Sequence, residues 1–352
     1  MRVLVTGATG LLGQHVVRAA LDAGHEVRAV VRRRGTPLDA LPSVRQCAAP
    51  ITDVARLAAA MENVEVVVHC AAVYAYGADR AAEVEQVNVV GTQRVVGAAA
   101  AAGVRRVVVT SSSVTCGSSV EPVPQDETGR LGDEVVPRYF TSKVRQEQAA
   151  LAAGESGGVE VVLAAPTVVL GGPADRLVPS NAIVLRYLLD PVRGTYPGGC
   201  NVVGVRDAAA GHLLLLEHGA AGERYLLGGE NVSWCSLHAT ISDLVGVPGP
   251  LALVPMPVAY AASAAAEAWA RLTARDPLST REEALTIGRW HWYSSAKAAA
   301  LGYVARPARA AVAESLAWLL VGPHLPRWVR EGLRVSPEVR AARPLVPRPL
   351  VP

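Results

Sequence analysis

Short apolar runs alternate with amphipathic segments over the first 165 residues of the chain. The runs are rich in Val and Ala and have the length of strands. Such runs are typical of strands that are buried on both faces of a sheet. Five strands are expected, over residues 3–5, 26–31, 64–69, 105–110 and 159–164.

Apolar residues recur at helical spacing between these runs. The pattern predicts helices over residues 12–21, 53–61, 81–102 and 139–153. Strands that alternate with helices through short connections indicate an α/β fold, with a doubly wound parallel sheet of the Rossmann type.

Pro and Gly become frequent after residue 165, which indicates a smaller C-terminal lobe. We expect residues 1–165 to form an NADP-binding Rossmann domain, to which residues 200–230 return. Residues 166–199 and 231–320 are expected to form a substrate-binding lobe.

Three other segments have a distinctive composition. Residues 121–137 are polar and contain prolines, so we expect a loop that forms one wall of the active site. Residues 251–274 are interpreted as an Ala-rich buried helix. Residues 321–352 are rich in Pro and Arg and are expected to form an extended or poorly ordered tail.

The overall composition argues against a nucleic-acid partner, a membrane partner and a metal site. The 352 residues carry a formal net charge of +3, with an isoelectric point near 8.7, which is too mild for a nucleic-acid partner. No apolar run of membrane-spanning length is free of charge, so no membrane partner is expected. A strand predicted within the first few residues argues against a signal peptide. Five scattered cysteines predict a reduced, cytoplasmic protein without a metal site.

A glycine-rich turn follows the first predicted strand. Gly7 permits a tight turn, Gly10 lets the backbone approach a pyrophosphate, and Gly13 lets the next helix lie close to the strand. The N–H groups at the start of that helix are suited to phosphate. The spacing Gly-x-x-Gly-x-x-Gly differs from the usual Gly-x-Gly-x-x-Gly, and an ordinary strand–helix turn is the alternative.

The residues after the second predicted strand indicate which cofactor binds. An NAD enzyme would place Asp or Glu there to accept from the ribose 2′-hydroxyl group. This chain has Arg32, Arg33 and Arg34 instead, and a guanidinium binds a 2′-phosphate. We therefore predict NADP(H), bound by Arg32 first and Arg33 second. NAD(H) with a solvated basic loop is the alternative.

Ser112, Tyr139 and Lys143 are the candidate catalytic residues. Tyr139 and Lys143 are four residues apart, so a helix places both on one face. A nearby ammonium would lower the pKa of the phenol, which could then exchange a proton with a carbonyl or alcohol oxygen. Ser112 could hydrogen-bond the same oxygen, although Ser113 is an alternative in this serine run.

Seven segments together resemble the extended short-chain dehydrogenase/reductase superfamily. The combination is similar to its dihydroflavonol-4-reductase-like branch and to the NAD-dependent epimerase/dehydratase family, including the hopanoid-associated sugar epimerases. The segments are residues 6–13, 88–92, 110–112, 139–143, 166–171, 205–212 and 222–229.

The resemblance implies roles for particular residues. Ser112, Tyr139 and Lys143 would be catalytic, and Asn88 would brace the helix that carries Lys143. A homodimer through the helices containing Asn88 and Tyr139 is also implied. Pro50 stands where the family often has an Asp that meets adenine, so adenine recognition must differ. The implied cofactor-binding residues are Gly7, Thr9, Gly10, Leu11, Leu12, Gly13, Arg32, Arg33, Ile51, Cys70, Ala71, Ala72, Tyr139, Lys143, Pro166 and Val168.

The resemblance leaves three functions open. The first is an NADPH-dependent ketone reductase, acting on a medium-sized, cyclic or aromatic small molecule of flavanonol or polyketide type. The second is a nucleotide-sugar epimerase or dehydratase with a retained cofactor, and the third is a non-catalytic NADP-sensing protein. Candidates for a substrate pocket are Trp234, Trp290, Trp292 and Tyr293, and candidates for a diphosphate site are Arg176, Arg186 and Arg193.

Overall fold

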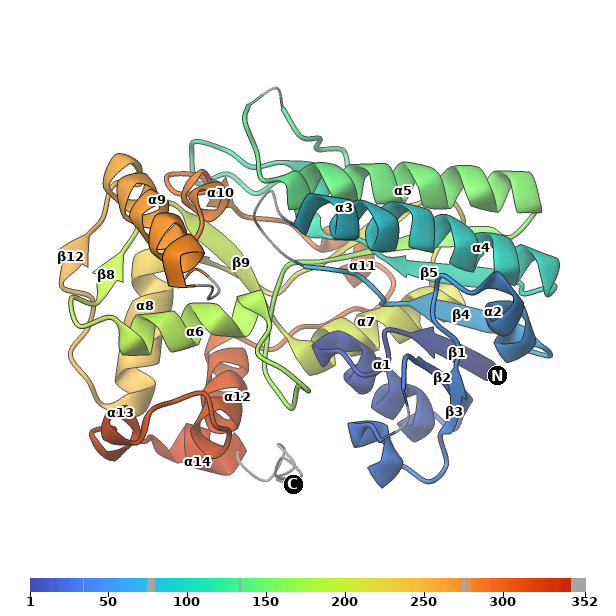
Figure 1. Cartoon of the computed structure of the whole chain (residues 1–352), viewed down its shortest axis with the longest axis horizontal. Helices are drawn as coiled ribbons and strands as arrows, with labels where there is room; N and C mark the ends of the chain where they lie inside the picture. The colour runs from blue at the N-terminus through green and yellow to red at the C-terminus, as the bar shows by residue number, and fades with distance from the viewer. Residues whose placement is uncertain (34, 75–79, 133, 274–276, 278, 343–352) are drawn as a thin grey trace.

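A seven-stranded parallel sheet forms the centre of the larger half of the molecule (Figure 1). The computed structural model describes residues 1–352 except 34, 75–79, 133, 274–276, 278 and 343–352. Neighbouring strands are parallel throughout, in the order β10-β6-β5-β4-β1-β2-β3. The strands are β1 (Arg2–Thr6), β2 (Glu26–Val31), β3 (Arg45–Ala48), β4 (Val66–His69), β5 (Arg106–Thr110), β6 (Glu160–Pro166) and β10 (Arg224–Leu227).

Helices cover both faces of this sheet, because its strands bury alternate side chains in two separate cores. Val3 and Val5 belong to the core under α1 and α7, whereas Leu4 belongs to the core under α2, α4 and α5. This arrangement is the predicted Rossmann-type α/β fold. The helices are α1 (Leu11–Asp22) and α7 (Val205–His218) on one face, and α2 (Val54–Met61), α3 (Ala81–Val84), a π-helical turn (Glu85–Val90), α4 (Gly91–Ala101) and α5 (Arg138–Gly157) on the other.

The strand order changes direction beside β1, which lies between β2 and β4. The carboxyl ends of these strands therefore border a crevice, the usual place for a nucleotide in such folds. β3 was not among the predicted strands, because its residues Arg45–Ala48 are few, mixed in polarity and only partly buried at the sheet edge. Val66–His69 is consequently the fourth strand in the chain, whereas we expected it to be the third.

Apart from α11 (Ala296–Ala299), which packs against β10 of the large sheet, the remaining strands and helices form the smaller half of the molecule, on the left in Figure 1. Residues 200–230 return to the large sheet only in part: α7 and β10 do, but β9 pairs with β7, β11 and β13. The elements of this half are β7 (Val168–Leu170), α6 (Pro179–Leu189), β8 (Gly194–Thr195), β9 (Gly199–Gly204), β11 (Glu230–Ser233), α8 (Trp234–Val245), β12 (Ala252–Leu253), α9 (Met256–Thr273), α10 (Arg281–Ala284), β13 (Trp290–His291), α12 (Ala308–Val321), α13 (Arg327–Glu331) and α14 (Pro337–Ala342).

Helix α9 forms where the Ala-rich helix was predicted, but the expectation that it is buried is wrong. Trp269 is 67% exposed and Leu272 is 82% exposed. The inward face carries Ser263 and Glu267, which bond Ser279 and Arg281. Polar contacts rather than apolar packing therefore hold this helix to its neighbours.

The prediction of an extended tail after residue 321 is also wrong as far as the chain is described. Residues 327–331 and 337–342 form α13 and α14, and Val339 is fully buried against α12. The last ten residues of the predicted tail, 343–352, lie outside the described residues. In the part of the chain that the structure covers, no helix has the length and apolarity that a membrane span requires.

Candidate active site

The glycine turn after β1 has the geometry that a bound pyrophosphate needs. Gly7 has φ +63°, and a Cβ there would lie 2.5 Å from the backbone N of Ala71. A Cβ on Gly13 would lie 2.2 Å from the Gly7 carbonyl oxygen. Gly10 is the N-cap residue of α1, and no side chain among the described residues caps the helix, so its first N–H groups are left for another acceptor. The turn and helix therefore fit a dinucleotide phosphate.

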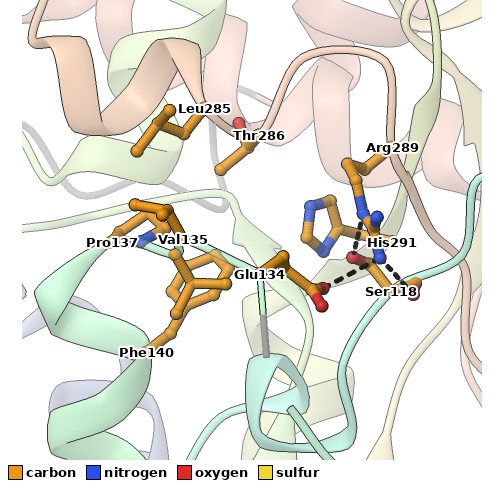
Figure 2. A pocket seen from close by; sticks show the side chains of 10 residues that line it. Ser118, Glu134, Val135, Pro137, Phe140, Leu285, Thr286, Arg289 and His291 are labelled. Carbon is orange, nitrogen blue, oxygen red and sulfur yellow. Dashed lines mark hydrogen bonds and ion pairs between the residues drawn. The ribbon is translucent and has the colours of Figure 1, made fainter. Parts of the chain in front are cut away.

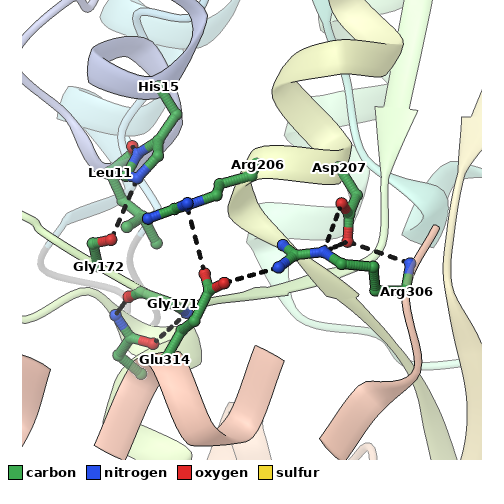
Figure 3. Close-up of polar contacts among 9 residues, drawn as sticks. Leu11, His15, Gly171, Gly172, Arg206, Asp207, Arg306 and Glu314 are labelled. Atoms are coloured by element: carbon green, nitrogen blue, oxygen red, sulfur yellow. Dashed lines mark hydrogen bonds and ion pairs between the residues drawn. The ribbon is translucent and has the colours of Figure 1, made fainter. Parts of the chain in front are cut away.

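A buried polar network ties α1 to the smaller half of the molecule (Figure 3). The ring of His15 bonds the carbonyl oxygen of Gly172 across 3.1 Å. The carboxylate of Glu314 lies between Arg206 and Arg306, at 3.7 and 2.8 Å. The His15 contact thus joins the phosphate-binding helix α1 to the smaller half, and the Arg206–Glu314 contact joins α7 to it.

The other predicted cofactor residues lie along the same edge of the sheet. Arg32 and Arg33 directly follow β2, and both are exposed. Arg34 lies outside the described residues. Ile51 packs against Gly91 of α4. Cys70, Ala71 and Ala72 follow β4, Thr9, Leu11 and Leu12 belong to the glycine turn and α1, and Pro166 and Val168 end β6 and begin β7.

Ser112 and Ser113 point to different partners. Ser112 lies close enough to the Tyr139 hydroxyl group to lower its pKa, whereas Ser113 acts in the same way on Tyr293. The Tyr293 hydroxyl also donates to the carbonyl oxygen of Gly117, at 2.8 Å. The geometry thus favours Ser112 over Ser113 as the partner of a substrate oxygen beside Tyr139.

Tyr139 lies in the first turn of α5 and is only 7% exposed, since the ring of Tyr74 stacks on it with centroids 4.5 Å apart. Burial raises the pKa of Tyr139, Tyr74 raises it further, and the neighbouring Ser112 hydroxyl group lowers it. The net shift is therefore upward, opposite to the direction that we expected from the nearby Lys143, because burial outweighs the other effects. The phenol is protonated at neutral pH and is therefore a proton donor.

Lys143 is fully buried beneath Tyr139, with its Nζ 5.8 Å from the centroid of that ring. The Nζ donates to the carbonyl oxygen of Thr110 at 3.1 Å and to Gln146 Oε1 at 2.7 Å. Burial lowers the pKa of Lys143 to about 8, and the carboxylate of Glu147 acts against that change.

Asn88 lies in the π-helical turn between α3 and α4 and braces a loop rather than Lys143 itself. Its amide bonds both backbone groups of Val73, at 2.7 and 3.0 Å. It reaches α5 only through Ser142, at 3.4 Å. The expected link to the Lys143 helix is thus indirect, and its main effect is to fix the segment that carries Tyr74.

A small pocket opens beside the Tyr139 helix (Figure 2). Phe140 forms one side, with its ring 6.3 Å from that of Tyr139 and 5.9 Å from that of His291. Arg289 lies at the rim, held by Glu134 and Ser118. None of the four aromatic residues expected at a pocket lines this one. Its lining is Ser118, Glu134, Val135, Val136, Pro137, Phe140, Leu285, Thr286, Arg289 and His291.

The expected pocket residues Trp234, Trp292 and Tyr293 instead take part in packing. Trp292 donates to the carbonyl oxygen of Val232, and Trp234 lies beside His238. Tyr293 is buried against the serine turn.

Several residues around the site were missed in the sequence. Gln146 and Glu147 follow Lys143 by three and four residues, so helical spacing could have identified both. Tyr74, Arg224 and His291 come from distant segments, and no local pattern marks them.

Comparisons with known proteins show the family and the fold of the chain. The model of the NAD dependent epimerase/dehydratase family matches residues 3–228. A putative dihydroflavonol 4-reductase of Synechocystis is 33% identical over 259 residues, which are 72% of this chain and 75% of that protein. Sterol demethylase protein B of Methylococcus capsulatus is 30% identical over 332 residues, 90% of this chain and 98% of that protein. The crystal structure of gox2253 has a TM-score of 0.79 at 31% identity, and covers 92% of this chain and 99% of that one.

Proposed function

Because the chain belongs to the NAD-dependent epimerase/dehydratase family of extended short-chain dehydrogenases/reductases, we propose that it is an NADPH-dependent ketone reductase. The family comprises NAD(P)-dependent oxidoreductases, epimerases and dehydratases. Within it, the proposed substrate is a medium-sized ketone with a cyclic or aromatic framework.

One observation carries the proposal: a protonated tyrosine lies close to a serine hydroxyl group, and a largely apolar pocket opens beside them. Ser112 meets Tyr139, and Phe140 extends from the same helix into the pocket. A buried phenol that keeps its proton suits donation to a carbonyl oxygen, which is the proton step of a reduction.

Tyr139, Ser112 and Lys143 would each have a separate role in the reduction. Tyr139 gives its proton to the carbonyl oxygen, and Ser112 hydrogen-bonds the same oxygen as negative charge forms there. The ammonium of Lys143 favours the phenolate left on Tyr139 and would hold the nicotinamide ribose. When bound, the reduced nicotinamide supplies the hydride.

The chain's own residues fit an NADP cofactor. Gly7, Gly10 and Gly13 would hold the pyrophosphate at the start of α1. Arg32, exposed at the end of β2 with Arg33 next to it, would bind the 2′-phosphate.

Three further points favour a ring ketone over a nucleotide-sugar. The relatives' names refer to a dihydroflavonol and to a sterol, both of which are ring compounds. Of the arginines considered for a diphosphate, Arg186 is already paired with Glu283 at 2.8 Å. Five of the ten pocket residues are Val, Pro, Phe or Leu, which suits an apolar framework.

A screen of cyclic and aromatic ketones with deuterated NADPH tests the proposal. Deuterium in the product alcohol is expected, with one NADP⁺ formed for each product molecule. Tyr139→Phe should lower turnover by about 10²-fold or more, because it removes a positioned acid. Turnover that survives in Tyr139→Phe would remove Tyr139 from the mechanism. Epimerisation of nucleotide-sugars without net cofactor consumption would support the epimerase instead.

A further inference from the structure

Glu147 contacts the turn that carries Ser112 both before and after that serine. Its side chain, on α5, is buried, with 8% of the residue exposed. The Oε1 atom accepts hydrogen bonds from the hydroxyl groups of Ser111 and Thr115, the latter at 2.9 Å. Ser111 precedes Ser112, and Thr115 closes the same turn by donating its backbone N–H to the Ser112 carbonyl oxygen. The position of Ser112 relative to Tyr139 therefore depends on this carboxylate.

Arg224 completes the arrangement from the edge strand β10. Its Nη1 donates to Thr115 Oγ1 at 2.8 Å and to Glu147 Oε2 at 3.3 Å. Its Nη2 donates to the carbonyl oxygen of Glu127, in the loop that precedes α5. The buried carboxylate is thus paired, which offsets the cost of removing it from water.

Glu147 also faces Lys143, which is one helical turn earlier on α5. The carboxylate attracts the ammonium and opposes the effect of burial on the pKa of Lys143. The other titratable groups around that ammonium are Cys70, His69 and the Tyr139 phenol. Among these groups, burial keeps Cys70, His69 and Tyr139 uncharged at neutral pH, so Glu147 is the charged one.

We propose that Glu147, paired with Arg224, is a positioning residue that fixes Ser112 against Tyr139 and stabilises the ammonium form of Lys143. The inference rests on the proposed reductase function for its kinetic consequences. Its electrostatic part is a property of the folded chain and can be measured without turnover.

The sequence offers a direct measurement, because Lys143 and Lys297 are its two lysines. Protein labelled with ¹³C at the lysine ε-carbon gives two signals, which Lys297→Arg assigns. A pH titration of the Lys143 signal then reports its ionisation in each variant.

Glu147→Gln keeps the shape and the hydrogen-bond acceptor but removes the charge. The expected result is a fall of about half a unit or more in the pKa of Lys143. With an active substrate, kcat should fall about tenfold and KM should stay within about twofold, because the cofactor and pocket contacts remain. Glu155→Gln, the same change at an exposed position of α5, is the matched control and should alter neither quantity.

Arg224→Gln is the second variant, and it keeps the inference testable if Glu147→Gln does not fold. It loosens the serine turn but leaves the carboxylate free to face Lys143. The pKa of Lys143 should therefore rise while kcat falls, because the Glu147 charge is no longer partly neutralised by Arg224. A structural role alone would give the two variants the same effect, namely a lower melting temperature and an unchanged titration.

An unchanged Lys143 titration in folded Glu147→Gln, or an unchanged or lower pKa of Lys143 in Arg224→Gln, would overturn the inference. Failure of the reductase proposal would give a different result from failure of this inference. In that case no ketone consumes NADPH in the unmodified protein, whereas the titrations still report whether Glu147 acts on Lys143.

Discussion

Burial raises the pKa of Tyr139 and lowers the pKa of Lys143, the two site residues of α5. In both it favours the neutral form, so Tyr139 keeps its proton and Lys143 loses its proton more readily than a free lysine. At neutral pH the site therefore combines a proton donor with an ammonium group. That pairing is suited to reducing a carbonyl group and then stabilising the phenolate that remains.

The ionisation of Lys143 predicts how activity changes with pH. Its pKa is lowered from 10.5 to about 8, so turnover should decline above about pH 8, as the ammonium is lost. The unfolded chain holds this proton up to a higher pH than the folded chain. The contribution of Lys143 to the free energy of unfolding therefore rises with pH between those two values.

Turnover rates and melting temperatures measured together from pH 6 to pH 10 would check both the decline in turnover and the rise in the contribution of Lys143 to stability. An alkaline limb that begins only near pH 10 would contradict the role given to Lys143.

Arg32 carries the prediction of cofactor preference. Arg32→Ala should weaken NADPH binding by about tenfold or more and leave NADH binding within about twofold, because only NADPH has the 2′-phosphate. Fluorescence titration with both nucleotides measures this directly. Arg33→Ala is the neighbouring comparison, with a smaller loss expected. Equal losses for the two nucleotides would dismiss a phosphate contact at Arg32.

Among whole elements, α1 depends on the absence of a side chain at Gly13. Gly13→Ala would place a Cβ 2.2 Å from the Gly7 carbonyl oxygen, so strand and helix must separate. We expect the free energy of unfolding to fall by about 1–3 kcal/mol, with weaker nucleotide binding. Urea unfolding and calorimetric titration measure the two effects.

Gly97, an exposed residue within α4, is the matched control for Gly13. A Cβ there would meet nothing within 4 Å, so Gly97→Ala should stabilise the protein by about 0.5–1 kcal/mol. If the two substitutions had the same effect, close packing of α1 on β1 would not be the reason for Gly13.

The elements of the first half of the chain could be predicted because their patterns are local. Val-rich runs bury both faces of a strand, and helical spacing places Tyr139 and Lys143 together. The sequence of β3 has no such pattern, so this strand was not predicted. The prediction that α9 is buried was wrong because an apolar composition does not show which faces of a helix other elements cover. Tyr74 and Arg224 reach the site only through tertiary packing, which leaves no trace at either position in the sequence.

At the scale of the whole molecule, the C-terminal helices complete the core of the smaller half. Val339 on α14 is fully buried against α12, so Val339→Ala should cost roughly 2 kcal/mol of unfolding free energy. Arg340→Ala, at the adjacent exposed position, should cost less than about 0.5 kcal/mol. Urea unfolding compares the two. Equal costs would show that α14 does not depend on this contact.

Cofactor binding to protein checked to be free of nucleotide tests the central claim most directly. Calorimetric titration with NADPH and with NADH should show NADPH binding reversibly and more tightly by about tenfold or more, as an exchangeable reductant requires. Protein that instead purifies with tightly retained NAD, and shows no preference for NADPH, would contradict the account. That result would favour an epimerase or dehydratase, in which the cofactor returns to its starting state.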